Sequence, residues 1–121
     1  MIRKVAFTLY AVKDMAAARV FYEGALGLAS AAGEKSPWVE YDLPGGGCFA
    51  ITTVMPDHQP SGSAGGMIAF EVEDIDALVA ALRDRGVKLG AQALIKGPHC
   101  RMMPCFDPDG NGMLLHQLDA A

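Results

Sequence analysis

The chain has 121 residues, which is enough to bury a core within one ordinary domain. Its composition is 51% hydrophobic and 20% charged, which is typical of globular proteins and argues against disorder. The net charge of −4 and the lack of a basic cluster argue against a nucleic-acid partner. No apolar run approaches the roughly 18 residues that span a membrane. Three cysteines without a secretion signal predict reduced thiols in the cytoplasm.

The first predicted elements are a strand and a helix. An apolar run begins at Val5 and ends shortly before Asp14. Because its carboxylate can accept free amides of the next turn, Asp14 is a good N-cap. Apolar residues then recur at helical spacing, and Gly27 suits the C-terminal turn. We therefore predict a helix from Met15 to Leu26.

A hairpin and a linker are expected next. Trp38 to Leu43 and Cys48 to Val54 are strand-like runs, and the glycine-rich stretch from Pro44 to Gly47 joins them. Residues 56–66 are rich in proline, glycine and serine, which is typical of a linker.

The rest of the chain repeats this pattern. Val72-Glu73-Asp74-Ile75 matches Val12-Lys13-Asp14-Met15 at an offset of 60 residues. Asp74 predicts a second N-cap, and Gly86 closes the second helix. Three further strands are expected: one near Val87 to Ala93, one from Arg101 to Phe106 and one from Met113 to Leu118, the last two joined by a turn at Asp107 to Asn111.

The repeat predicts an α+β fold built from two tandem βαβββ modules within a single domain, residues 1–121. Module one covers about residues 2–55, the linker 56–66, and module two about 67–119. Neither half could bury its sheet alone. We therefore expect a curved mixed sheet around a cup-shaped cavity, with the helices outside.

Two motifs resemble the vicinal oxygen chelate superfamily. They are the segment with Asp14-Met15, Phe21-Tyr22 and Leu26-Gly27-Leu28, and the turn Asp107-Pro108-Asp109-Gly110-Asn111. That superfamily holds glyoxalase I, extradiol dioxygenases, bleomycin resistance proteins and fosfomycin resistance enzymes. The resemblance covers nearly the whole chain and implies the fold and a homodimer. It does not fix the function, because this scaffold carries several chemistries.

The resemblance also locates four positions that bind a metal in the superfamily's enzymes. Their ligands are His, Glu or Gln on the first and fourth strands of each module. The corresponding residues here are Phe7, Thr52, Met67 and Leu114, and the register of the strand with Thr52 stays open by two residues. Phenylalanine and leucine have no lone pair, and a thioether is a poor ligand for a hard ion. This comparison implies no metal and no cofactor.

Alternation along the strands predicts which residues face the cavity. We expect an apolar hollow with a few polar groups, as is typical of small-molecule sites. The predicted lining is Phe7, Leu9, Trp38, Glu40, Thr52, Met67, Glu71, Arg101, Met103, Leu114 and His116.

Several of these side chains have a second interpretation. Trp38 could stack on a ring or a cation, or pack in the core or a dimer interface. Arg101 could clamp a ligand's carboxylate or phosphate, or pair with a neighbouring acid. His116 could be a displaced metal ligand or a hydrogen-bonded histidine at a strand end. Glu71 and Glu40 could simply face solvent.

Three functions follow from these patterns. The first is a small-molecule-binding protein resembling the bleomycin resistance branch, whose ligand is aromatic or cationic because the lining is acidic and contains Trp38. The second is a metal-dependent lyase or dioxygenase with a shifted site at Glu40, Glu71 and His116. The third is a metal-independent enzyme, in which apolar walls raise the pKa of Glu71 or Glu40 so that it acts as a general base.

Overall fold

The computed structural model describes residues 1, 3, 5–55, 58–63 and 65–120. Positions 56, 57 and 64 of the predicted linker lie outside these ranges, as does position 2 at the start of the first predicted module. The chain divides into two compact units, Met1–Pro60 and Ser61–Ala121, and each is described by itself. No helix in the described ranges is long and apolar enough to cross a membrane.

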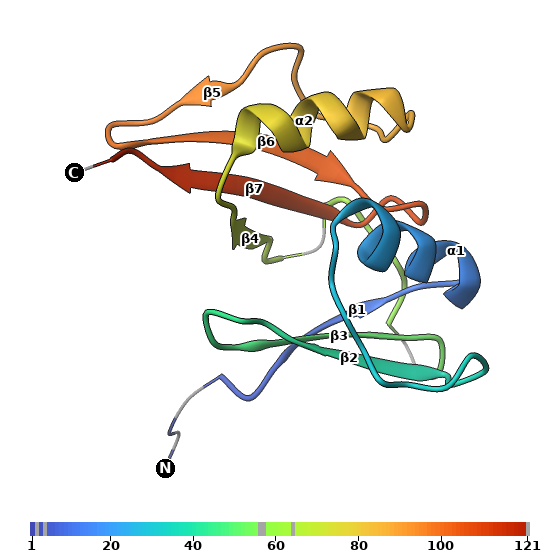
Figure 1. Cartoon of the computed structure of the whole chain (residues 1–121). Helices are drawn as coiled ribbons and strands as arrows, with labels where there is room; N and C mark the ends of the chain where they lie inside the picture. The colour runs from blue at the N-terminus through green and yellow to red at the C-terminus, as the bar shows by residue number, and fades with distance from the viewer. Residues whose placement is uncertain (2, 4, 56–57, 64, 121) are drawn as a thin grey trace. The chain divides into compact units, whose positions relative to one another are not determined.

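The first unit contains one helical segment and a three-stranded sheet (Figure 1). Its elements are β1 (Thr8–Ala11), α1 (Met15–Arg19), the π-helix η1 (Val20–Ala25), β2 (Trp38–Asp42) and β3 (Cys48–Thr52). The strand order is β1-β3-β2, with β1 parallel and β2 antiparallel to β3. The helix and the hairpin predicted from the sequence are both present, but the second half of the helix is π-helical.

The ends of this helical segment follow the predicted signals. The Asp14 carboxylate accepts the backbone N–H of Ala17 at 3.0 Å, which satisfies one of the free amides of the first turn. Gly27 has a φ of +77°, in the left-handed region that favours glycine. This turn lets the N–H of Leu28 reach the carbonyl of Tyr22 at 2.9 Å.

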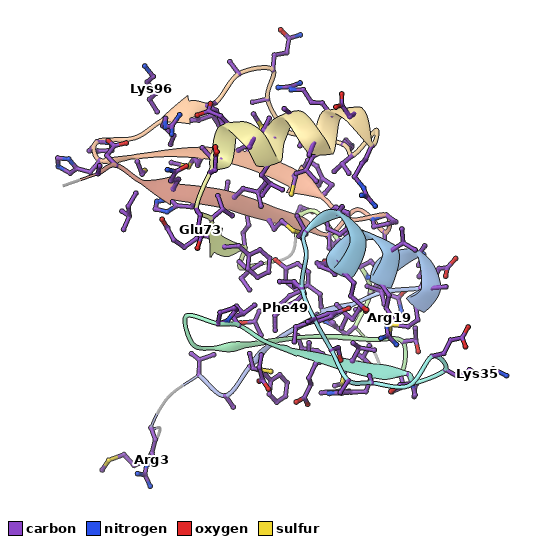
Figure 2. The ribbon with its side chains drawn as sticks, viewed as in Figure 1. Arg3, Arg19, Lys35, Phe49, Glu73 and Lys96 are labelled. Carbon is purple, nitrogen blue, oxygen red and sulfur yellow. The ribbon has the colours of Figure 1, made fainter. Side chains whose placement is uncertain are left out.

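Aromatic side chains fill the layer between α1–η1 and the sheet. Phe49 lies on the helix side of the sheet (Figure 2). Its ring centroid is 5.1 Å from that of Tyr22 and 6.4 Å from that of Tyr41, and all three residues are fully buried. Large buried rings contribute most of the apolar area of a small core, so the contact between Tyr22 and Phe49 helps to hold the helix on the sheet.

The predicted βαβββ order needs a correction in this unit. Among its described residues there is no strand between Gly27 and Trp38, so the order is βαββ. The segment from Leu28 to Gly33 consists of small residues and leucine, without the β-branched or aromatic side chains that favour strands.

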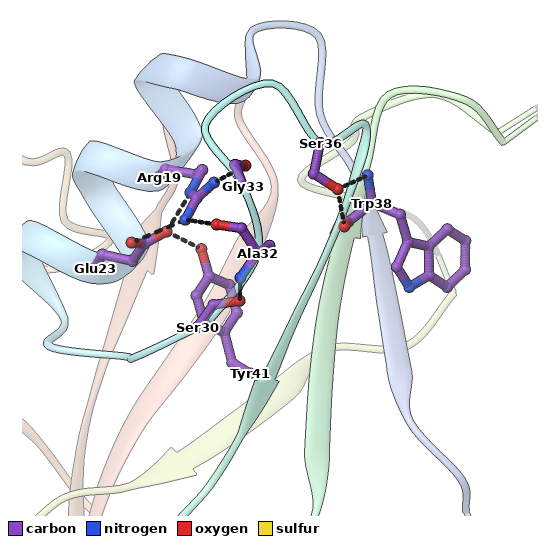
Figure 3. A network of polar contacts seen from close by, with 8 residues as sticks. All are labelled: Arg19, Glu23, Ser30, Ala32, Gly33, Ser36, Trp38 and Tyr41. Carbon is purple, nitrogen blue, oxygen red and sulfur yellow. Dashed lines mark hydrogen bonds and ion pairs between the residues drawn. The ribbon is translucent and has the colours of Figure 1, made fainter.

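An arginine holds this segment in place of a strand ladder. Arg19 donates from Nη1 to the carbonyl of Gly33 at 2.8 Å and from Nη2 to that of Ala32 at 3.2 Å (Figure 3). Its Nε lies 2.6 Å from Glu23 Oε2, which also accepts the hydroxyl of Tyr41 at 2.9 Å. One ion pair thus ties the helix to β2 and to the loop.

The second unit has the full βαβββ order. Its elements are β4 (Ile68–Glu71), α2 (Ile75–Asp84), β5 (Ile95–Lys96), β6 (Cys100–Phe106) and β7 (Gly112–Leu118). The strand order is β4-β7-β6-β5; β4 is parallel to β7, and the other pairs are antiparallel. Asp74 caps α2 as predicted, since its carboxylate accepts the N–H of Ala77 at 3.1 Å.

The strand predicted near Val87 to Ala93 is not formed. Leu89 makes only an isolated bridge with Cys105, and the edge strand is the two-residue β5. Gly90 donates to the carbonyl of Pro104 at 2.8 Å, but a proline has no N–H to return the bond. Pro104 therefore interrupts the ladder at the point where the predicted strand would pair.

The core of the second unit lies between α2 and one face of its sheet. The buried side chains are Ile75, Val79 and Leu82 from α2 and Phe70, Met103, Cys105, Met113 and Leu115 from the strands. Burial raises the pKa of the Cys105 thiol to about 12, so this cysteine is a packing residue and not a nucleophile.

Candidate functional site

In the first unit, the predicted lining residues share the face of the sheet opposite the helix. Leu9, Ala50 and Glu40 form one row of paired residues across the sheet. Ala11, Thr52 and Trp38 form the next row. Paired residues project to the same side, so these rows define one surface. The buried Val39 and Tyr41 alternate with them and face the helix, as predicted.

The polar and aromatic groups of this face contact one another. Trp38 Nε1 donates a hydrogen bond to Glu40 Oε2 at 2.8 Å. The ring of Phe7 meets the Trp38 indole edge-on, with 5.8 Å between centroids. Figure 3 shows the indole directed away from the Arg19 network. The result is an aromatic pair beside an exposed carboxylate, and we call Phe7, Trp38 and Glu40 the indole–carboxylate patch.

Thr52 is on the same face, but its hydroxyl is hydrogen-bonded to the protein backbone. The side chain is fully buried. Its Oγ1 donates to the carbonyl of Pro37 at 2.9 Å and accepts the N–H of Val54 at 3.1 Å. Thr52 therefore stabilises the end of the hairpin.

The second unit presents an equivalent face opposite α2. Glu71, His116 and Met102 form one row of paired residues. Ala69, Leu114 and Pro104 form the row beside it. We call these six residues and Met67, which precedes β4 and is half-exposed, the outer face of the second unit.

The structure corrects the face assigned to Arg101 and Met103. Met103 pairs with Leu115 and is fully buried on the α2 side of the sheet. Arg101 pairs with Gln117, and its Nη1 lies 2.8 Å from the carboxylate of Asp76 on α2. The predicted parity of this strand was shifted by one residue. For Arg101 the open alternative, a pair with a neighbouring acid, is the one observed.

Glu71 and His116, 45 positions apart in the chain, form a hydrogen-bonded pair on the outer face. His116 Nδ1 lies 2.6 Å from Glu71 Oε1, and Glu71 Oε2 accepts the N–H of Leu118 at 2.8 Å. The N–H of Val72 donates to the carbonyl of His116 at 2.8 Å, which fixes the two strand ends side by side. The contacts with His116 and Leu118 thus give each oxygen of the Glu71 carboxylate a hydrogen bond.

These bonds set the charge state of Glu71. The Leu118 amide and the His116 ring both stabilise the carboxylate and hold the pKa of Glu71 below its ordinary value. The raised pKa expected for Glu71 as a general base is therefore wrong, because its surroundings provide two hydrogen-bond donors in place of apolar walls. Glu71 can orient a base, but it is not itself a strong one.

The internal repeat resolves the register of the fourth metal-ligand position. Leu114 pairs with Ala69, and the residue that occupies this position in the first unit is Ala50, which pairs with Leu9. The position predicted at Thr52 is therefore two residues earlier. Ala50 has no donor atom either.

A divalent ion does not fit the side chains at the superfamily's ligand positions. These side chains are those of Phe7, Ala50, Met67 and Leu114, which offer one thioether and three hydrocarbon groups. Across the described part of the chain, no group of three or more His, Cys, Asp or Glu side chains could hold a metal ion.

The Asp-Pro-Asp-Gly-Asn turn is structural. The Asp107 carboxylate accepts the N–H groups of Asp109 and Asn111, both at 2.9 Å, and the side-chain amide of Asn111. Asn111 Oδ1 in turn accepts the N–H of Ser61 at 2.9 Å. The motif that is specific for the fold thus closes the β6–β7 turn.

The family model for the Glyoxalase/Bleomycin resistance protein/Dioxygenase superfamily matches residues 4–114. The chain belongs to this superfamily. Its α+β fold, with βαβββ-like modules and mixed sheets, is typical of the group. The superfamily's scaffold carries several chemistries, so membership is compatible with ligand positions that do not suit a metal ion.

Solved structures of the superfamily are similar over nearly the whole chain. TnmS3, an antibiotic binding protein from Streptomyces sp. CB03234, is 28% identical with a TM-score of 0.76 and 98% of each chain covered. A superfamily member from Sphaerobacter thermophilus DSM 20745 is 26% identical with a TM-score of 0.77, covering 96% of this chain and 98% of its own. A glyoxalase family protein from Bacillus anthracis, at 17% identity and a TM-score of 0.77 with 98% of each chain covered, shows the fold alone. No curated protein matches the chain.

Proposed function

We propose that this protein binds a small aromatic or cationic molecule against the indole–carboxylate patch, in the manner of the superfamily's bleomycin resistance branch. The observation that carries the proposal is the Trp38–Glu40 hydrogen bond, which sets an indole and a carboxylate side by side. An indole face attracts cations and stacks on rings, and a carboxylate adds attraction for positive charge. The likeness to TnmS3, an antibiotic binding protein, supports a small-molecule ligand.

In the first unit we propose Phe7 and Leu9 as apolar ligand contacts beside Trp38 and Glu40. In the second unit, taken by itself, we propose a separate set of ligand contacts, the apolar Met67 and Leu114 and the polar Glu71 and His116. Apolar walls with a few polar groups are typical of ligand sites. We also propose a homodimer, as the superfamily implies; sedimentation equilibrium tests it, and a monomer at all concentrations would contradict it.

Fluorescence of Trp38 tests ligand binding, because it is the chain's single tryptophan. We propose titrations with the N-methylquinolinium cation and with 1-methylnaphthalene, its neutral isostere. Both should quench Trp38, and the cation should bind more tightly. Glu40→Gln should weaken cation binding by about tenfold, as expected for one lost charge contact, and leave the neutral isostere unaffected.

Glu34→Gln is the matched control, since Glu34 is an exposed glutamate of the same unit and its removal changes the net charge equally. It should leave both titrations unchanged. If both variants weakened cation binding equally, Glu40 would act only through the net charge of the protein, which would contradict the proposal.

A metal-independent enzyme is the second candidate function, because Glu71 and His116 form an acid–base pair. Recovery of the bound ligand distinguishes the two candidates. A binding protein returns it unchanged. An enzyme converts it in the presence of a chelator and loses this conversion in His116→Gln.

A further inference from the structure

We propose that Glu71 and His116 form a proton-transfer site that takes up a small molecule with a weakly acidic hydroxyl group, such as a phenol or an enol. This inference does not depend on ligand binding at the indole–carboxylate patch, because the Glu71–His116 pair belongs to the second unit and the patch to the first.

The fold does not require this pair. In the internal repeat, Ala11 and Thr52 occupy the positions of Glu71 and His116, since each pair links the first and last strands of its unit at the same register. Ala11 and Thr52 are buried, and Thr52 bonds only backbone groups. One unit thus forms the same strand pairing without a titratable group, so the pair in the other unit calls for a role beyond packing.

The contacts of Glu71 dictate the tautomer of His116. Both carboxylate oxygens are bonded, and the N–H that Leu118 donates to Oε2 stabilises the ionised form of the carboxylate. An ionised carboxylate can only accept, so His116 Nδ1 carries the proton between them. In the neutral ring Nε2 then holds the lone pair. Within the part of the chain that the structure describes, Nε2 has no hydrogen-bond partner.

The surroundings of the pair suit a ring that carries a hydroxyl group. Met102 pairs with His116 on the outer face, and Leu114 and Pro104 lie in the adjoining row. Ala69, in the same row, is exposed and small. Side chains of this kind contact the apolar part of a ligand, and the imidazole is the polar group at one end.

The proposed step is a reversible proton transfer. The O–H bond of the ligand breaks, an N–H bond forms at His116 Nε2, and the ligand remains as its oxyanion against the imidazolium. Glu71 keeps its negative charge and stabilises the imidazolium through Nδ1. Release returns the proton from Nε2 to the oxygen, so no further reactant is needed.

The test uses 4-nitrophenol, whose anion absorbs visible light, and 4-nitroanisole, its methyl ether, which has no proton to give. We expect 4-nitrophenol to bind the wild-type protein with an increase in anion absorbance. His116→Gln should weaken binding by about tenfold, as for one lost hydrogen bond to a charged group, and abolish the absorbance change. Glu71→Gln should reduce the absorbance change, because the imidazolium loses its counter-charge.

Two exposed residues give matched controls, His99→Gln and Glu73→Gln, and both should behave as wild type. A further measurement needs no variant protein: on titration of the wild type with 4-nitrophenol, the ring signal of His116 should shift in NMR spectra and those of His58 and His99 should not. Equal affinity for the two probes, no binding of 4-nitrophenol, or a His116→Gln variant identical to His99→Gln would overturn the proposal. Failure of the N-methylquinolinium titrations would leave it standing.

Discussion

Thr52 and His116 occupy the same position in the two halves of the internal repeat, yet they form opposite kinds of contact. Thr52 pairs with Ala11, and its hydroxyl donates a hydrogen bond to the backbone carbonyl of Pro37. His116 pairs with Glu71 through Nδ1, and its other ring nitrogen has no hydrogen-bond partner among the described residues. The repeat therefore preserved the strand pairing and let the side chains diverge, and the two faces offer different chemistry.

Removal of the Tyr41 hydroxyl should destabilise the first unit. Tyr41 is fully buried and donates to the Glu23 carboxylate at 2.9 Å. Tyr41→Phe keeps the ring and loses this bond, so we expect the free energy of unfolding to fall by about 1–2 kcal/mol in urea titrations. An unchanged midpoint would show that Arg19 alone holds Glu23.

The Arg19–Glu23 pair should make stability dependent on pH. The guanidinium of Arg19, with the Tyr41 hydroxyl, holds the pKa of Glu23 below its ordinary value. A lowered folded-state pKa stabilises the fold above the unfolded-state pKa, and this stabilisation is lost as pH falls through the folded-state value.

Glu23→Gln removes this contribution. We therefore expect a smaller loss of stability than in the wild type when urea unfolding is measured from neutral pH down into the acidic range. Because Glu71 also has a lowered pKa, some acid sensitivity should persist in the variant. Identical pH profiles for the two proteins would exclude Glu23 as a contributor.

The backbone at Gly27 should resist any side chain, although space is available. A Cβ at Gly27 or at Gly33 would meet no atom within 4 Å, but only Gly27 has a left-handed φ, at +77°. Gly27→Ala should cost about 1–2 kcal/mol in unfolding free energy. Gly33→Ala is the matched control and should cost less. Equal costs would contradict the assignment of the cost to the left-handed φ of Gly27, because the lower entropy of the unfolded chain favours alanine at both positions.

Cys105 should be unreactive in the folded protein. It is fully buried, and desolvation raises the pKa of its thiol to about 12, whereas Cys48 and Cys100 are partly exposed. Titration with a thiol reagent should leave Cys105 unmodified under native conditions and modify all three cysteines in urea. Rapid native labelling of Cys105, located by peptide mass spectrometry, would contradict the packing described for β6.

Ligand binding should survive chelation. The superfamily's ligand positions hold Phe7, Ala50, Met67 and Leu114, which suit no divalent ion. Dialysis against a chelator should therefore leave the N-methylquinolinium affinity unchanged. A drop that added zinc or manganese reverses would mean that other side chains bind a metal.

Much of the fold could be predicted because its signals are local. Asp14 and Asp74 predict the starts of the two helices, and Gly27 predicts the end of the first. Alternation in Trp38–Asp42 correctly separates the two faces of that strand. The missing strand of the first unit was harder, because the Arg19 contacts that replace it join residues 13 and 14 positions apart.

The candidate site was only partly predictable, for two reasons. Parity in β6 was ambiguous, since methionine occupies both faces there, and burial alone separates Met102 from Met103. The pairing of Glu71 with His116 depends on the register between β4 and β7, which periodicity does not give. The repeat relates the two registers, because Ala11 and Thr52 are paired in the same way between the parallel strands β1 and β3.

The ¹H–¹⁵N NMR spectrum offers the most direct test of ligand binding at the indole–carboxylate patch, because Trp38 contributes its single indole N–H signal. Titration with N-methylquinolinium should shift this signal and the amides of β2, and Glu40→Gln should remove most of the shift. Saturable binding that leaves the Trp38 indole signal unmoved and perturbs other amides, such as those from Arg83 to Gln92, would contradict the account.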